Sequence, residues 1–353
     1  MSYQDGWAAV NLEMPARVPR IEFDADGHWS LVSRVTGIPV AHDSPELLRG
    51  EARRAFIRAW NYDLIPGTML HAPELAARRT QMGHAVYADG GVDYVPEQFC
   101  PFSGPEEALR FDPWETFGKK DQRELIRRFE EHYRQSCAAF PDLVSTTGTY
   151  ITLLTGLIYI FGWELLLETA GVDPDGFGEV LNRYGTWMQQ YYDALAQTDV
   201  PLISSHDDIV WTAGAIFAPE WYRRYIFPNL KKLYAPLIAA GKKVLFLSDG
   251  DYTEFVDDLV GCGVHGFFME PLTDMRYVAE KYGKTHFFIG NVDTRILLRG
   301  DKPAIRAEVE RCMAIGRKCP GFFIGVTNMI PANTPVDSAL YYNEVYLELS
   351  RRR

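Results

Sequence analysis

The sequence of 353 residues is poor in cysteine, has no long unbroken apolar run and carries no surplus of positive charge. Its five cysteines are scattered and form no CxxC pair, which argues against a disulfide framework or a thiolate zinc knuckle. The formal charge of −11 argues against binding to nucleic acid or to an anionic membrane surface, because both need clustered basic residues. The most apolar stretch, residues 151–167, is broken by Gly156, Gly162 and Glu164 and is too short to cross a bilayer. Residues 1–11 lack the pattern of a signal peptide, so a soluble cytoplasmic protein is expected.

Motifs of several common enzyme classes are also missing. The chain has no GxxxxGK[ST] phosphate loop and no GxSxG nucleophile elbow, and it shows no local signature of Cys/His nucleophilic catalysis. These absences disfavour a P-loop nucleotide hydrolase and a serine or cysteine hydrolase.

Short apolar runs that end in polar residues alternate with amphipathic stretches, most clearly in the second half of the chain. Strands are predicted at residues 20–23, 143–146, 201–206, 243–247, 266–269, 286–289 and 321–325. Helices are predicted at residues 45–60, 121–140, 219–227, 229–240, 254–260, 274–282, 303–317 and 336–349.

This alternation is typical of a parallel sheet that helices cover on both faces. We expect an α/β protein with one domain over residues 1–353. The fold would be a (β/α)8 TIM barrel of parallel strands, preceded by an N-terminal extension over about residues 1–19. An open doubly wound sheet is the alternative.

Polar side chains gather at the predicted strand ends, where such a barrel places its reactive groups. They are His206, Asp207, Asp208, Asp249, Asp251, Glu270, Asn291, Asp293 and Asn328. Carboxylates that meet at one barrel mouth repel one another, so one of them must be protonated or a cation must lie among them. This pattern predicts either an acid/base pair or a metal site.

Structural roles compete with functional ones at several of these positions. Asp251 and Asp293 fit helix caps or turns as well as they fit a site. A histidine at a strand end, such as His206, is more often hydrogen-bonded within the fold than bound to a metal. Glu270, between Met269 and Pro271, is neither a cap nor a surface residue, which favours a functional role. His28 follows the first strand, where it could reach the mouth or pack at the start of a helix.

The order of the strand ends resembles the uroporphyrinogen decarboxylase superfamily, which also contains cobalamin-dependent methyltransferases. The matching segments are RVPR at residues 17–20, DD at 207–208, APEWY at 218–222, FP at 227–228, LSDG at 247–250, GNVD at 290–293 and IPANTP at 330–335. The likeness covers most of the chain and is tightest from about residue 200 to 345.

The resemblance implies two activities, and this sequence departs from the pattern of each. The decarboxylases hold a polycarboxylated tetrapyrrole with an N-terminal arginine-rich run, whereas residues 22–28 here read EFDADGH, which would repel carboxylates. The methyltransferases hold zinc with His-x-Cys-Gly at the sixth strand end and a second cysteine before the last helix. Leu247, Asp249 and Asn328 stand at those positions here, so all three of those ligands are replaced.

An enzyme acting on a small molecule is the leading expectation: a metal-assisted methyltransferase that moves a methyl group between a small methylated substrate and a corrinoid. Asp249 and Glu270 would hold the metal, zinc for example, with Asn328 or His206 as a third ligand. Asp207 or Asp208 would act as general acid, beside His206. His28, Asn291 and Asp293 are the predicted substrate-binding residues.

Two alternatives remain open. One is a decarboxylase acting on uroporphyrinogen or another carboxylated substrate, which would need no cofactor. The other is a barrel that binds a ligand without catalysis. The resemblance also implies a partner corrinoid protein for the methyltransferase and a homodimer. The negative net charge predicts no nucleic-acid or membrane partner.

Overall fold

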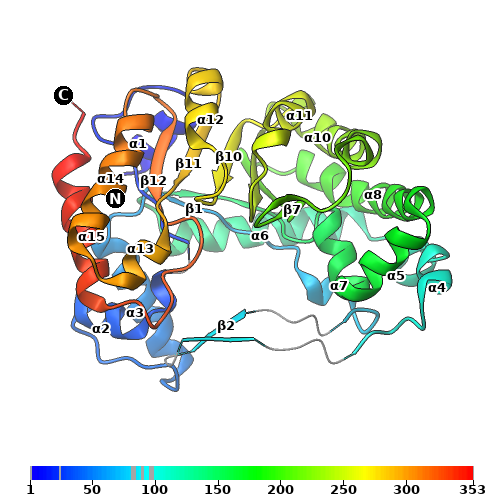
Figure 1. Ribbon diagram of the computed structural model, residues 1–353, viewed down its shortest axis with the longest axis horizontal. Helices are drawn as coiled ribbons and strands as arrows, with labels where there is room; N and C mark the ends of the chain where they lie inside the picture. Colours follow the sequence, from blue (N-terminus) through cyan, green and yellow to red (C-terminus); the bar gives the residue numbers. More distant parts are fainter. Residues whose placement is uncertain (1, 24, 81–84, 89–90, 95–98, 353) are drawn as a thin grey trace.

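Parallel strands form the centre of the molecule, and helices surround them (Figure 1). The computed structural model describes residues 2–23, 25–80, 85–88, 91–94 and 99–352. Six strands form one parallel sheet in the order β12-β11-β10-β9-β6-β5, and β1 pairs with β4 in parallel. The bounds are β1 Leu64–Ile65, β4 Val144–Ser145, β5 Thr147–Thr149, β6 Leu202–His206, β9 Lys243–Ser248, β10 Gly266–Met269, β11 Phe287–Asn291 and β12 Phe322–Gly325.

The segment at residues 20–23 closes this sheet into a barrel. On one side, Ile21 N–H donates to the carbonyl oxygen of Ile324 in β12 at 3.1 Å, and the bridge between Arg20 and Ile324 is parallel. On the other side, the carbonyl oxygen of Arg20 accepts from Asp63 N–H, immediately before β1, at 2.8 Å. Because β4 and β5 are successive parts of one strand, the ring contains eight parallel strands, as the sequence predicted.

The helices follow the strands in the alternation that a parallel barrel requires. Their bounds are α1 Tyr3–Val10, α2 Trp29–Thr36, α3 Glu46–Ala59, α4 Pro105–Leu109, α5 Pro113–Phe117, α6 Gln122–Ala139, α7 Leu154–Val172, α8 Pro174–Ala196, α9 Pro219–Trp221, α10 Phe227–Ala239, α11 Val256–Cys262, α12 Met275–Tyr282, α13 Thr294–Arg299, α14 Lys302–Gly316 and α15 Val336–Leu349. Two short antiparallel hairpins interrupt the pattern: β2 Ala85–Ala88 with β3 Gly91–Tyr94, and β7 Val210–Trp211 with β8 Gly214–Ala215.

Helix α1 packs on the apolar side chains that fill the barrel interior. Ala9 and Val10 of α1 belong to the same buried cluster as Leu64, Val144 and Leu202 at the beginnings of their strands. Gly6 lies so close to the carbonyl oxygen of Asp63 that a Cβ would stand 2.5 Å from it. The predicted N-terminal extension therefore closes the end of the barrel opposite the mouth.

The helices predicted from residue 254 onward are found within a few residues of their expected bounds, and the last coincides with α15. The helices predicted at residues 219–227 and 229–240 instead form one continuous segment, in which a π-helical stretch, Tyr222–Ile226, joins α9 to α10. Two further differences matter. The helix expected to close near Gly261 continues to Cys262, because Gly263 supplies the left-handed C-cap at φ 99°. Strand β9, which leads to Asp249, is the fifth strand of the barrel. The sequence comparison with the methyltransferase pattern had placed Asp249 at the end of a sixth strand. Within the part of the chain that the structure describes, no helix is long and apolar enough to cross a membrane.

Candidate active site at the barrel mouth

The carboxyl ends of the strands surround a cavity of about 170 Å³, which we call the mouth cavity. It lies where a barrel of this type presents its loops. Its lining joins three of the predicted site residues to apolar and hydroxyl side chains. The lining residues are Phe23, Tyr150, His206, Leu247, Ser248, Asp249, Phe268, Thr327, Asn328 and Met329.

His206 is held with both ring nitrogens facing oxygen acceptors. Its Nε2 lies 3.2 Å from Oδ1 of Asp208, and its Nδ1 lies 3.0 Å from the carbonyl oxygen of Tyr150. A carboxylate and a carbonyl can only accept, so this geometry suits the doubly protonated imidazolium. Burial disfavours the charged ring, but the carboxylate of Asp208 outweighs it and raises the pKa of His206 to about 9. His206 is therefore a cation at neutral pH.

Asp208 and Asp249 carry carboxyl groups beside this cation, and Glu270 lies near Asp249. Asp208 Oδ1 also accepts the backbone N–H of Asp249 at 3.0 Å, and Glu270 Oε2 accepts that of Gly250 at 2.6 Å. Asp249 is reached by solvent, yet its carboxyl is crowded by the walls of the mouth. Desolvation there, with the negative charges of Asp208 and Glu270, raises the pKa of Asp249 well above its usual range. The predicted crowding of carboxylates is present.

The proposed metal ligands are neighbours, but Asn328 and Glu270 are hydrogen-bonded to each other. Asn328 donates its side-chain amide to Glu270 Oε1, while its Oδ1 accepts the N–H of Met329 at 2.7 Å. Among the described residues, no three His, Cys, Asp or Glu side chains lie close enough together to hold a metal ion. The oxygen of Asn328 is turned away, so the set of Asp249, Glu270 and Asn328 does not fit a metal, and we derive no step through one.

The side chains of Asp207 and Asp208 point in different directions, Asp207 toward the start of α7 and Asp208 toward His206. Asp207 is fully buried, and its Oδ1 accepts the N–H groups of Thr155 and Leu153 at 2.8 and 3.2 Å, which fixes the start of α7. Burial raises its pKa to about 7, although those two hydrogen bonds oppose the change. Neither Asp207 nor Asp208 lines the mouth cavity, and of these two predicted general acids only Asp208 forms an ion pair with His206.

His28 and Asn291, two predicted substrate-binding residues, are engaged in structural hydrogen bonds. Nδ1 of His28 caps α2 by accepting from Leu31 N–H, and its Nε2 bonds the carbonyl oxygen of Thr334 at 2.8 Å, so neither nitrogen is left for a ligand. The amide of Asn291 donates to the carbonyl oxygens of Glu270 and Thr273 at 3.2 and 3.0 Å. Asn291 therefore positions the loop that carries Glu270.

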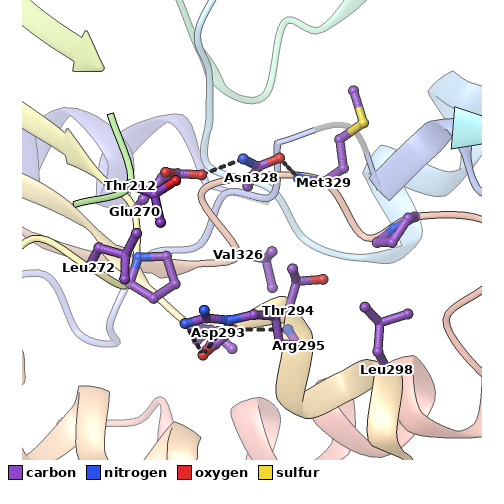
Figure 2. Close-up of a pocket in the computed structure, with 13 residues that line it drawn as sticks. Thr212, Glu270, Leu272, Asp293, Thr294, Arg295, Leu298, Val326, Asn328 and Met329 are labelled. Carbon is purple, nitrogen blue, oxygen red and sulfur yellow. Dashed lines mark hydrogen bonds and ion pairs between the residues drawn. The ribbon is translucent and has the colours of Figure 1, made fainter. Parts of the chain in front are cut away.

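A second cavity of about 290 Å³ adjoins the mouth, and we call it the side chamber (Figure 2). Its lining includes the third predicted substrate-binding residue, Asp293, together with Glu270 and Asn328. Asp293 also caps α13 by accepting from Arg295 N–H, so it has the capping role and a place in a cavity wall. Partial burial opposes its ionisation, but the hydrogen bonds from Arg295 lower its pKa.

Sequence reasoning missed Tyr150 and Arg295. The strand predicted at residues 143–146 continues through β5 to Thr149, which makes Tyr150 a strand-end residue like the others. Extending that strand by three residues would have found it. Arg295 carries no comparable signal, because an arginine in the first turn of a short helix is ordinary.

A closed (β/α)8 barrel with acid and imidazole side chains at its mouth defines the molecule as a barrel enzyme. The model of the family "Uroporphyrinogen decarboxylase (URO-D)" matches residues 132–345, and the chain belongs to that family, which confirms the resemblance seen in the sequence. It is thus an enzyme of the uroporphyrinogen decarboxylase superfamily, and the matched region contains every mouth residue from Tyr150 to Met329.

Individual relatives are distant. A protein named uroporphyrinogen decarboxylase from Carboxydothermus hydrogenoformans is 26% identical over 226 residues, 62% of this chain and 61% of that protein. One of the same name from Thermus thermophilus is 27% identical over 163 residues, 46% of each chain. The matched region thus spans about half to three-fifths of these relatives. A solved methyltransferase from Methanosarcina mazei is 15% identical with a TM-score of 0.62, covering 97% of this chain and 96% of that one, which shows a shared fold.

Proposed function

We propose that this enzyme transfers a methyl group from a small, uncharged or cationic methylated substrate to a corrinoid, and does not decarboxylate a tetrapyrrole. The observation that carries the proposal is the charge of the cavity walls. Among the described residues that line the two cavities, Arg295 is the only arginine, and it is paired with Asp293 at 2.8 Å. A polycarboxylate would meet the carboxylates of Asp249 and Glu270 with no free arginine to bind it.

The sizes of the cavities support the same conclusion. Drug-sized ligands occupy pockets of roughly 300–1,000 Å³. The two cavities measure about 170 and 290 Å³, which suits a small molecule better than a carboxylated macrocycle. The methyltransferase from Methanosarcina mazei, which has the same fold, supports methyl transfer as the reaction.

For an uncharged substrate, His206 supplies the proton that the transfer needs. When the bond between the methyl carbon and its oxygen or nitrogen breaks, the methyl group forms a new bond to the acceptor. The Nε2 proton of the His206 imidazolium moves from its contact with Asp208 to the electron pair left on the heteroatom, which releases a neutral alcohol or amine. A cationic ammonium substrate leaves as a neutral amine and takes no proton. Asp208, at 3.2 Å, holds the ring in place and stabilises its charge before the transfer. Asp249 and Glu270 favour a substrate without negative charge.

The acceptor enters as a co-substrate. Neither cavity has room for a corrinoid, so we propose that it is presented at the open rim, on a corrinoid protein, where Asp249 is reached by solvent. The reduced corrinoid supplies the nucleophile that receives the methyl group.

The decisive experiment tests one protein preparation for methyl transfer and, separately, for decarboxylation of uroporphyrinogen. Wild-type protein and the His206→Gln variant are incubated with cob(I)alamin and a series of neutral methyl ethers and methylamines, and methylcobalamin is followed by its absorbance. We expect methylation with the wild type and a loss of about 100-fold in the variant, the usual contribution of a general acid. The Asp251→Asn variant, whose side chain can still cap Thr253, is the matched control and should keep wild-type activity. Stepwise loss of carboxyl groups from uroporphyrinogen, or no methylation across the whole series, would contradict the proposal.

A further inference from the structure

The side chamber lies between the ends of β10, β11 and β12 on one side and α13 on the other. Its walls are mainly apolar, its charged and amide side chains come in two pairs, and the hydroxyl side chains of Thr212 and Thr294 complete the lining. The apolar lining is formed by Pro271, Leu272, Val292, Leu298, Val326, Met329 and Pro331. In Figure 2, Glu270 with Asn328 and Asp293 with Arg295 flank the cavity, with Val326 between them.

The two residues of each pair contact each other, so neither pair offers a free positive charge to a ligand. Arg295 holds Asp293 in a two-pronged contact, with Nε at 2.9 Å from Oδ1 and Nη2 at 2.8 Å from Oδ2. Glu270 accepts from Asn328 and from Gly250, and the guanidinium of Arg295, which acts on Glu270 through its charge, is held by Asp293. A carboxylate in the chamber would lie beside Glu270, and an uncharged apolar group would lose nothing by leaving water.

The chamber adjoins the cavity that holds the reacting groups. Asn328 and Met329 line both the chamber and the mouth cavity, so the two cavities meet at these residues. A substrate held in the chamber would present its end to the mouth, where His206 and Asp249 form part of the wall.

We infer that the side chamber binds the uncharged, apolar body of the substrate, with the methylated heteroatom directed past Asn328 into the mouth. This inference rests on the proposed function for the position of the methyl group. It makes Leu272 and Leu298, on opposite walls, determinants of substrate specificity.

The test uses two probes of one shape, butyl methyl ether and 4-methoxybutanoate, which differ by a carboxylate. Binding is measured by saturation-transfer NMR on the wild type and on Leu298→Trp, which fills the chamber. Leu347→Trp, at a position on α15 that is 49% exposed, is the matched control for adding a tryptophan. Leu272→Trp fills the chamber from the other wall, so the test can still be made if Leu298→Trp does not fold.

We expect the ether to bind the wild type and the control equally, and its saturation transfer to fall at least fivefold in each chamber-filling variant that remains folded. The carboxylate should bind the wild type at least tenfold more weakly. Equal ether binding in the filled variants, or carboxylate binding as strong as ether binding, would overturn the inference.

The binding and activity measurements distinguish failure of the proposed reaction from failure of the proposed substrate chamber. Ether binding that depends on Leu298, without any methyl transfer to cob(I)alamin, supports the chamber and removes the proposed reaction. Methyl transfer with an unchanged KM in Leu298→Trp supports the reaction and removes the chamber as the place where the substrate binds.

Discussion

The imidazole ring of His206 lies flat on the phenol ring of Tyr150, with the ring centroids 3.9 Å apart and the planes 5° apart. The carbonyl oxygen of the same tyrosine faces Nδ1 of the histidine at 3.0 Å. Tyr150 thus stabilises the charged ring twice, by its π face and by its main chain, while Asp208 does so from the other nitrogen.

A pH dependence follows from this arrangement. The folded pKa of His206, about 9, is above the ordinary 6.5, so the folded state binds this proton more tightly than the unfolded state does. The resulting stabilisation is complete below pH 6.5 and is lost as the pH rises through about 9. Methyl transfer should decline over the same upper range, because the acid form disappears. The measurement is the NMR titration of the ring protons alongside the pH profile of kcat.

Replacing Tyr150 separates the ring contact from the main-chain contact. Tyr150→Leu removes the π face, worth about 1 kcal/mol, and should lower the His206 midpoint by less than one pH unit. Tyr150→Phe keeps the stack and should leave the midpoint near 9. An unchanged midpoint in the leucine variant would show that Asp208 and the carbonyl oxygen of residue 150 set the charge without the ring.

Asp207 should make the protein less stable as the pH rises from about 4 to 7. Its pKa is about 7 in the folded state against an ordinary 3.8, so unfolding releases a proton in this window. Asp207→Asn keeps the Oδ1 that caps α7 and removes the titration, so its stability relative to wild type should improve over the same window. Asp207→Ala also removes the titration but loses the cap, so it should be about 1 kcal/mol less stable than Asp207→Asn at every pH. Urea unfolding at pH 5 and pH 8 measures both effects, and a wild type and Asn variant with parallel pH profiles would refute the assignment.

Metal content is the next prediction. Because Asn328 turns its oxygen to Met329 and no described group of three acidic, His or Cys side chains converges, protein purified without chelator should carry well under one zinc per chain. The double variant Asp249→Ala, Glu270→Ala should carry the same low amount by elemental mass spectrometry. One equivalent in the wild type that disappears in the double variant would restore these two residues as metal ligands.

The long elements could be predicted from the sequence because each carries its own signal. Strand β9 is an unbroken apolar run, and α15 is bounded by Pro335 at its start. Strand β1 has only two residues, Leu64–Ile65, and it pairs with residues of β4 that lie 80 positions further along the chain. No local sequence pattern therefore predicts it.

The sequence predicted which strand ends form the site, but it did not predict which of their side chains contact one another. Which of two adjacent carboxylates pairs with His206 depends on the turn after β6, and that turn is fixed by Thr155 Oγ1, which accepts the N–H of Asp208 at 2.7 Å. The turn sends Asp207 inward to α7 and Asp208 toward His206. In the same way, the contact between Asn328 and Glu270 joins residues 58 positions apart, which spacing along the chain does not reveal.

Closure of the barrel rests on a buried ion pair that gives a last prediction. Arg20 is fully buried among the rings of Trp60, Tyr342 and Tyr346, and its Nε donates to Glu22 Oε1 at 2.6 Å. Glu22 Oε2 accepts the N–H that follows β12 at 2.6 Å, so the pair joins the first strand segment to the last strand. Arg20→Met leaves Glu22 buried without its cation and should cost about 3–5 kcal/mol in the free energy of unfolding. Adding Glu22→Gln removes the stranded charge, so the double variant should be more stable than Arg20→Met alone by urea unfolding. A double variant no more stable than the single one would show that the cost comes from lost packing of the guanidinium on the aromatic rings.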